Sequence, residues 1–221
     1  MFGDLASLRI VWKLRRLKLN NMINMIKVAK PFSLLLLGLV FLGCGESEKE
    51  KSASVIDEAI RMELEKPDGE LTQSDFQKIK KLSVYSVARP VKDITSVGKL
   101  TNLEELDFAG GDISDSAPLA KLTKLRHLQI NECKLQDLSA LSGLDSLEEL
   151  SASGNQISDL SSLKGLKKLR TIALNNNLIK DASPLFRLKS LKWVNLKGNP
   201  ISQEAIRALK KALPKCKIEH D

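Results

Sequence analysis

Residues 147–190 read LEELSASGNQISDLSSLKGLKK followed directly by LRTIALNNNLIKDASPLFRLKS, and this stretch decides the fold. The two halves are copies of one 22-residue unit, because apolar residues stand at the same offsets in each. In both directions from this stretch, the same spacing keeps the columns aligned without gaps. The opening pattern Leu-x-x-Leu-x-Leu recurs, with apolar replacements, as Leu103/Leu106/Phe108, Leu125/Leu128/Ile130, Leu147/Leu150/Ala152, Leu169/Ile172/Leu174 and Leu191/Val194/Leu196.

Each unit has the periodicity of a strand followed by a turn. The last two apolar positions of the pattern alternate with polar residues, which is the period of a strand. A single unit cannot bury its apolar side alone, so neighbouring units must stack into one continuous core. Another apolar column completes the inner side of each unit: Ile113, Leu135, Ile157, Ile179 and Ile201.

The pattern resembles that of bacterial leucine-rich-repeat proteins with the 22-residue, internalin-type repeat, and the resemblance covers residues 54–221. It implies an α/β repeat solenoid. This is a curved, right-handed horseshoe with a concave parallel sheet, tight turns or 3₁₀ segments on the convex side, a helical N-cap and a C-terminal helix–strand cap. It also implies a ladder of asparagines that hydrogen-bond the backbone where the chain leaves each strand. The corresponding column holds Arg89, Gly111, Cys133, Asn155, Asn177 and Asn199, so only its last three members are Asn.

Both ends of the repeat region have the pattern of caps. Ile79-x-x-Leu82-x-Val84 predicts a first strand in a 24-residue coil, and Thr72 predicts the start of a short helix before it. At the other end, residues 203–212 have the apolar spacing of a helix. Leu213-x-x-Cys216-x-Ile218 then predicts one more unit, 22 residues after Leu191.

Residues 25–44 predict an export signal. Lys27 and Lys30 precede a short apolar run from Phe32 to Leu42, and its eleven residues are too few to span a bilayer as a helix. The following Gly43-Cys44 resembles the bacterial lipobox, in which the cysteine is acylated and becomes the mature N-terminus, although Phe41 replaces the usual Leu. An ordinary signal peptide and an uncleaved anchor are the alternatives. Lipidation predicts an exported, membrane-anchored protein, on the periplasmic face of the outer membrane if the cell is Gram-negative.

The chain therefore divides into five predicted parts. The first two dozen residues are set aside from the fold, because Met22 and Met25 are both candidates for the true start. The parts are 1–43, a signal peptide (with 1–24 a candidate mis-set start); 44–53, a lipidated N-terminus and flexible tether; 54–78, a helical N-cap; 79–202, the leucine-rich repeats; and 203–221, the C-terminal cap.

The net charge of +8 does not indicate nucleic-acid binding, because its distribution is uneven. From Cys44 onward the chain has 28 basic and 26 acidic residues, a net of +2, which cannot form the broad basic face that phosphates need. The excess belongs to the export segment, whose basic residues are Arg9, Lys13, Arg15, Arg16, Lys18, Lys27 and Lys30.

Metal binding and catalysis are weakly supported. A column of aspartates invites a cation-binding interpretation, but Asp at a turn more simply caps backbone amides. His127 and His220 are the only histidines, which leaves no His/Cys cluster with zinc spacing. Cys133 and Cys216 lie too many coils apart for a disulfide. An open sheet excludes water poorly, which disfavours catalysis. We predict no cofactor, no metal and no enzymatic activity. The aspartate column is Asp93, Asp115, Asp137, Asp159 and Asp181.

The side chains between the leucines are predicted to form a binding face on the concave sheet. Trp193 and Tyr85 are the only Trp and Tyr after Cys44, and both fall on this face, where aromatic residues commonly anchor a partner. His127 lies between Glu105 and Glu149 in one column, and a solvated polar face is the plain interpretation of these three residues. The predicted protein-binding residues are Tyr85, Glu105, Asp107, His127, Gln129, Glu149, Ser151, Thr171, Asn175, Trp193, Asn195 and Lys197.

The sequence thus predicts an envelope-anchored monomer that binds a protein or peptide on its concave face. The alternative is a structural or scaffolding lipoprotein without one specific ligand. A mixed polar and aromatic face favours the first hypothesis, although fold alone does not determine function.

Overall fold

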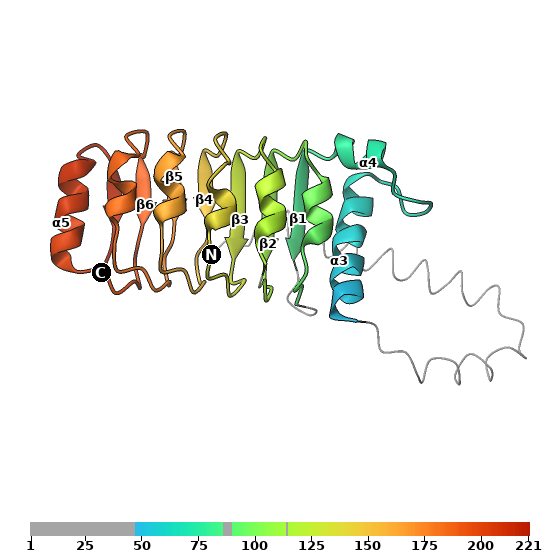
Figure 1. Ribbon diagram of the computed structural model, residues 1–221, viewed down its shortest axis with the longest axis horizontal. Helices are drawn as coiled ribbons and strands as arrows, with labels where there is room; N and C mark the ends of the chain where they lie inside the picture. The colour runs from blue at the N-terminus through green and yellow to red at the C-terminus, as the bar shows by residue number, and fades with distance from the viewer. Residues whose placement is uncertain (1–46, 86–89, 114) are drawn as a thin grey trace, which may run out of the picture. The chain divides into compact units, whose positions relative to one another are not determined.

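The computed structural model describes residues 47–85, 90–113 and 115–221 (Figure 1). The predicted signal peptide and Cys44 lie outside the described residues, as does Arg89 of the ladder column. Residues 46–221 form one compact unit, and the hydrophobic core runs from Ile56 to Leu213 within it. Among the described residues, no helix is both long and apolar enough to cross a membrane.

Seven parallel strands form one sheet in chain order, which confirms the predicted solenoid with its concave sheet (Figure 1). The register advances by 22 residues between the central strands, as in Leu128 beside Leu150, and by 24 between Leu82 and Leu106 as predicted. Short parallel strands this regular need a crossover for each return of the chain, and the rest of each coil supplies it. The strands are β1 (Lys81–Tyr85), β2 (Glu105–Ala109), β3 (His127–Asn131), β4 (Glu149–Ser151), β5 (Thr171–Ala173), β6 (Trp193–Asn195) and β7 (Lys217–Glu219).

A row of 3₁₀ helices lies on the other side of the core from the sheet (Figure 1). Leucine side chains from the strands and from these helices are almost fully buried between the two layers, as with Leu150 and Leu163. Burial of this apolar surface is the main stabilising contribution in such a stack. The 3₁₀ helices are η1 (Thr95–Lys99), η2 (Ala117–Lys121), η3 (Ser139–Leu141), η4 (Ser161–Gly165) and η5 (Ser183–Arg187).

The asparagine ladder is confirmed where the sequence keeps it. Asn155 accepts from the amides of Cys133 and Leu135, both at 3.0 Å, and donates to the carbonyls of Ile130 and Ala152. One side chain therefore satisfies backbone groups in its own coil and in the preceding one. Asn177 and Asn199 make corresponding bonds in the next two coils.

The aspartate column caps backbone amides, as predicted. In all five coils that carry this aspartate, the carboxylate accepts from the amide two residues later, at 2.7–2.8 Å. Hydrogen bonds from the hydroxyl and amide of Ser161 also hold the pKa of Asp159 below its usual value. Among the described residues, no group of His, Cys, Asp or Glu could hold a metal ion.

The N-terminal cap is longer than predicted, and the flexible tether is correspondingly shorter. Helix α3 (Glu48–Glu63) begins inside the segment predicted as tether, and α4 (Gln73–Lys78) begins after Thr72 as predicted. A reciprocal capping box between Ser47 and Glu50 starts α3. Ser52 is only 2% exposed, and its hydroxyl accepts from the amides of Lys92 and Asp93. The prediction that 48–53 is flexible was wrong. The charged residues of this segment indicated a tether, but charged side chains can equally lie on the solvated face of a helix.

The C-terminal cap contains the predicted helix, but the strand that follows it pairs in a different register from the one predicted. Helix α5 (Gln203–Ala212) places Ile206 and Leu209 in the core. The predicted 22-residue unit would align Cys216 with Val194, but the structure pairs Ile218 with Val194, a step of 24 residues. A ten-residue α-helix uses more chain than the 3₁₀ turns of the other coils, so the last strand begins later. Cys216 is half-buried ahead of that strand.

The two described cysteines are free thiols. Cys133 is buried at the ladder position, where burial raises the pKa of its thiol to about 11. A thiol held neutral in this way is a poor nucleophile, so Cys133 acts as a packing residue.

Candidate functional site

The predicted face is built by the strict alternation of the strands. Leu128 and Ile130 of β3 point into the core, so His127 and Gln129 between them point the other way. Parallel register then places equivalent residues of successive strands side by side. The first column runs Glu105, His127, Glu149, Thr171, Trp193, and the second runs Asp107, Gln129, Ser151, Ala173, Asn195.

A hollow of about 390 Å³ lies on this face over β4 and β5. The short side chains of Ser151, Thr171 and Ala173 occupy its centre, and the larger side chains of His127 and Trp193 stand on the strands at either side. The short side chains of β4 and β5 therefore leave a hollow among the larger side chains of His127, Glu149 and Trp193. It brings together seven of the predicted residues: Glu105, His127, Gln129, Glu149, Ser151, Thr171 and Trp193.

The remaining predicted residues lie on the same face but outside the hollow. Tyr85 is 53% exposed, and its hydroxyl is hydrogen-bonded to the carboxylate of Asp107. Asn175 accepts from Ser153 at 2.7 Å, and Lys197 lies beyond β6. The sequence interpretation missed Ala173 as a lining residue, although its small size in the second column was the available signal.

Hydrogen bonds among the polar side chains hold the floor of this face in place. The Ser151 hydroxyl donates to Asn131 Oδ1 at 2.9 Å, and the Ser153 amide donates to the same oxygen at 2.9 Å. Side chains that are already fixed lose little conformational entropy when a partner arrives. The polar floor is therefore preorganised for binding.

The charged residues of the hollow are arranged in pairs. His127 Nδ1 lies 3.2 Å from Glu149 Oε2, while Glu105 forms its ion pair with Lys81 at 2.7 Å. The sequence predicted two carboxylates beside His127, but Glu105 turns instead to the lysine of β1. Parallel pairing places both Lys81 and His127 next to Glu105, and the lysine offers it a permanent charge.

Trp193 is held at one end of the hollow by the last strand. Its indole Nε1 donates to Glu219 Oε1 at 3.1 Å, and the ring is half-buried. Lys217 and Trp193 together lower the pKa of Glu219. The C-terminal strand therefore fixes the predicted aromatic anchor, a role that the sequence alone did not indicate.

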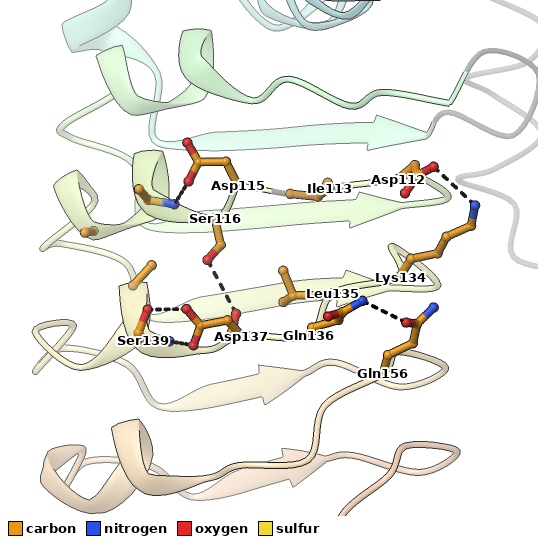
Figure 2. Close-up of a pocket in the computed structure, with 13 residues that line it drawn as sticks. Asp112, Ile113, Asp115, Ser116, Lys134, Leu135, Gln136, Asp137, Ser139 and Gln156 are labelled. Atoms are coloured by element: carbon orange, nitrogen blue, oxygen red, sulfur yellow. Dashed lines mark hydrogen bonds and ion pairs between the residues drawn. The ribbon is translucent and has the colours of Figure 1, made fainter.

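A larger groove, of about 610 Å³, lies on the flank between the second and third coils and was not predicted (Figure 2). Ser116 lines it and stands where three other coils have Ile94, Leu138 and Leu160. This break in the apolar column was the signal available in the sequence.

The polar groups of the flank groove already serve the repeat itself. Asp112 forms an ion pair with Lys134 at 3.2 Å, and Asp137 accepts hydrogen bonds from Ser139. Figure 2 shows both pairs along the groove. Asp115 caps the amide of Ala117. We therefore assign this groove to the scaffold and the smaller hollow on the sheet to the candidate site.

Comparisons with known proteins agree with this architecture. Family models for leucine-rich repeats match residues 145–187 (two copies) and 99–117. No curated protein matches the chain. Internalin C2 of Listeria monocytogenes is similar in structure, with 25% identity and a TM-score of 0.57, over 76% of this chain and 85% of that one.

Two other similar structures are of longer chains, and this chain spans only about half of each. An internalin (inlF) of Listeria monocytogenes has 27% identity and a TM-score of 0.57, over 77% of this chain and 57% of that one. A leucine-rich-repeat protein of Leptospira interrogans has 23% identity and a TM-score of 0.50, over 66% of this chain and 44% of that one, and supports the fold alone. The chain thus contains leucine-rich repeats and is structurally similar to internalins.

Proposed function

We propose that this leucine-rich-repeat chain is a binding module that recognises a protein or peptide on the concave face of its sheet. The observation that carries the proposal is the hollow in which His127, Glu149 and Trp193 converge from β3, β4 and β6. An aromatic side chain beside polar groups of fixed position is the usual composition of an interface hot spot. Leucine-rich repeats commonly mediate protein binding, which supports the same function.

Binding is favoured over catalysis by the bonding of Ser151, whose hydroxyl lines the hollow together with His127. Ser151 donates to Asn131 and not to His127. A serine nucleophile needs a base within hydrogen-bonding reach, and the hollow is open to solvent. The same residues are well suited to contact a partner.

We also propose that the module is held at the envelope by a lipid on Cys44, as a monomer that leaves the concave face free. The apolar run ending at Gly43-Cys44 supports anchoring. The near-neutral charge after Cys44 argues against nucleic acid as the partner. In a Gram-negative cell the expected location is the periplasmic face of the outer membrane.

Trp193→Ala is expected to weaken binding of the partner by about 30-fold or more, because truncating an anchoring aromatic typically costs 2 kcal/mol or more. Residues 46–221 would be immobilised to capture proteins from the envelope extract of the source organism, and the retained protein titrated by calorimetry. Trp193→Phe keeps an aromatic ring but loses the bond to Glu219, so it separates contact from positioning. Arg207→Ala, on the outer face of α5, serves as the matched control. Identical retention by wild type and Trp193→Ala would favour the scaffolding function.

Cys44→Ser is expected to abolish lipid labelling and to release the protein from the membrane fraction, because no other acyl acceptor of the lipobox type precedes the repeats. Cells grown with an alkyne-bearing palmitate analogue would report the label on the purified protein. Intact mass of the wild type should show an acylated N-terminus at Cys44. A wild-type mass that includes residues upstream of Cys44, or a labelled serine variant, would contradict the anchor.

A further inference from the structure

The hollow on the sheet has a negative lining. Glu105 and Glu149 contribute carboxylates to it, and none of the described residues that line it is a lysine or arginine. Glu105 is paired with Lys81, whereas the imidazole of His127 is the one described basic side chain within ion-pair reach of Glu149. Glu149 therefore retains a carboxylate oxygen for an incoming donor.

The second feature is the aromatic side chain at the opposite end. Trp193 lies two strands from Glu149 in the same column, with only Thr171 between them. Strands are spaced about 4.8 Å apart, so the backbone positions of Glu149 and Trp193 are about 10 Å from each other. This span accommodates a planar cationic group with its alkyl stem lying against the indole.

We infer that the partner places a basic side chain, arginine above all, in this hollow, with its guanidinium at Glu149 and its stem against Trp193. This inference rests on the proposed function and identifies the chemistry of the partner. A guanidinium bonds a carboxylate through two parallel N–H groups and also stacks on an aromatic ring, which an ammonium does less well. Gln129 and Ser151 provide further polar groups beside it.

Other anchors fit the hollow less well. An acidic side chain would meet Glu149, and Asp107 lies on the same face, on β2, two strands from Glu149. An apolar side chain would exclude water from Glu149 and Gln129 without replacing its hydrogen bonds, which is costly. Charge complementarity therefore favours a basic anchor over both.

A selection of random heptapeptides displayed on phage tests this inference. The bait is residues 46–221, which contain the whole core and both caps, and parallel selections use Trp193→Ala and Glu149→Gln. We expect wild-type selections to enrich peptides that share one Arg or Lys position. Their synthetic versions should bind Glu149→Gln about tenfold more weakly than wild type. Affinity for the wild type should also fall as salt is raised.

The neighbouring Glu148→Gln provides the matched control. Glu148 makes its ion pair with Arg126 at 2.8 Å and does not line the hollow, so the basic peptides should bind this variant as they bind wild type. Thermal unfolding of each variant would check that the fold is kept.

The two proposals fail in different ways. Peptides that depend on Trp193 but carry apolar or acidic anchors, or that bind Glu149→Gln as well as wild type, would overturn the basic anchor and leave concave-face binding standing. Enrichment of the same peptides on wild type and Trp193→Ala, or of none on either, would overturn both.

Discussion

Asn155→Ala is expected to lower the free energy of unfolding by about 3 kcal/mol or more. The side chain is only 7% exposed and makes five hydrogen bonds to main-chain groups, the longest of them at 3.4 Å to the carbonyl of Ser153. Its removal leaves the amides of Cys133 and Leu135 and the carbonyl of Ile130 without this partner, whereas the carbonyl of Ala152 still accepts from Asn177. Each buried unsatisfied group costs about 1–3 kcal/mol. Water entering the space recovers part of this loss, which sets the estimate near the lower end of the sum. Urea unfolding followed by circular dichroism would measure the change.

Gln156→Ala is the matched control, one residue further along the same turn. Gln156 is exposed and its side chain bonds only to Gln136, at 3.1 Å, so its loss should change stability by less than about 0.5 kcal/mol. The contrast between adjacent residues isolates the ladder from the turn itself. Equal stability losses in the two variants would show that the ladder bonds contribute little.

The core residues could be predicted from the sequence because every repeat shows the same apolar positions. Each buried column contains several apolar residues, so one atypical residue does not obscure the 22-residue period. One such column is Leu106, Leu128, Leu150, Ile172 and Val194. The capping role of the aspartates could be predicted for the same reason. An aspartate that recurs two residues before a turn amide has one simple structural role, to accept a hydrogen bond from that amide. Repetition makes the scaffold predictable.

The candidate site was less predictable because its residues do not repeat. Alternation places Glu149, Thr171 and Trp193 on one face, but the hollow depends on which neighbouring strands carry short side chains. The partner of Glu105 also depended on a competition between Lys81 and His127 that column position alone cannot decide. Face columns vary from coil to coil while core columns do not, so binding can change without cost to the fold.

The start of the N-terminal cap and the register of the last strand were predicted wrongly, because capping helices replace the repeat at both ends of the solenoid. Ser47 and Glu50 start a helix in a segment whose composition resembles a tether, and the ten residues of α5 shift the last strand by two. These departures have a function, because the last strand supplies the acceptor that holds Trp193. The C-terminal cap thus stabilises the solenoid and positions its aromatic anchor together.

Leu209→Asp should therefore have a large effect on both stability and the site, lowering the free energy of unfolding by about 4 kcal/mol or more. Leu209 is 0% exposed on the inner face of α5, and a carboxylate there would be buried without a partner. Ala208→Asp introduces the same group on the exposed face of the same helix, where the cost is limited to helix propensity, about 0.5 kcal/mol.

Because each coil contacts only its neighbours, loss of the cap should spread inward from the C-terminal end. Amide hydrogen exchange on Leu209→Asp should lose protection first in β7 and β6 and later in the strands nearer the N-terminus. Trp193 fluorescence should shift to the red before the far-ultraviolet circular dichroism changes. Uniform loss of protection across all seven strands would instead mean that the solenoid unfolds as one cooperative unit. Equal destabilisation by Ala208→Asp would show that α5 is not held by its buried face. If the cap loosens ahead of the central coils, positioning of the anchor at the concave face is the most easily lost property of this fold.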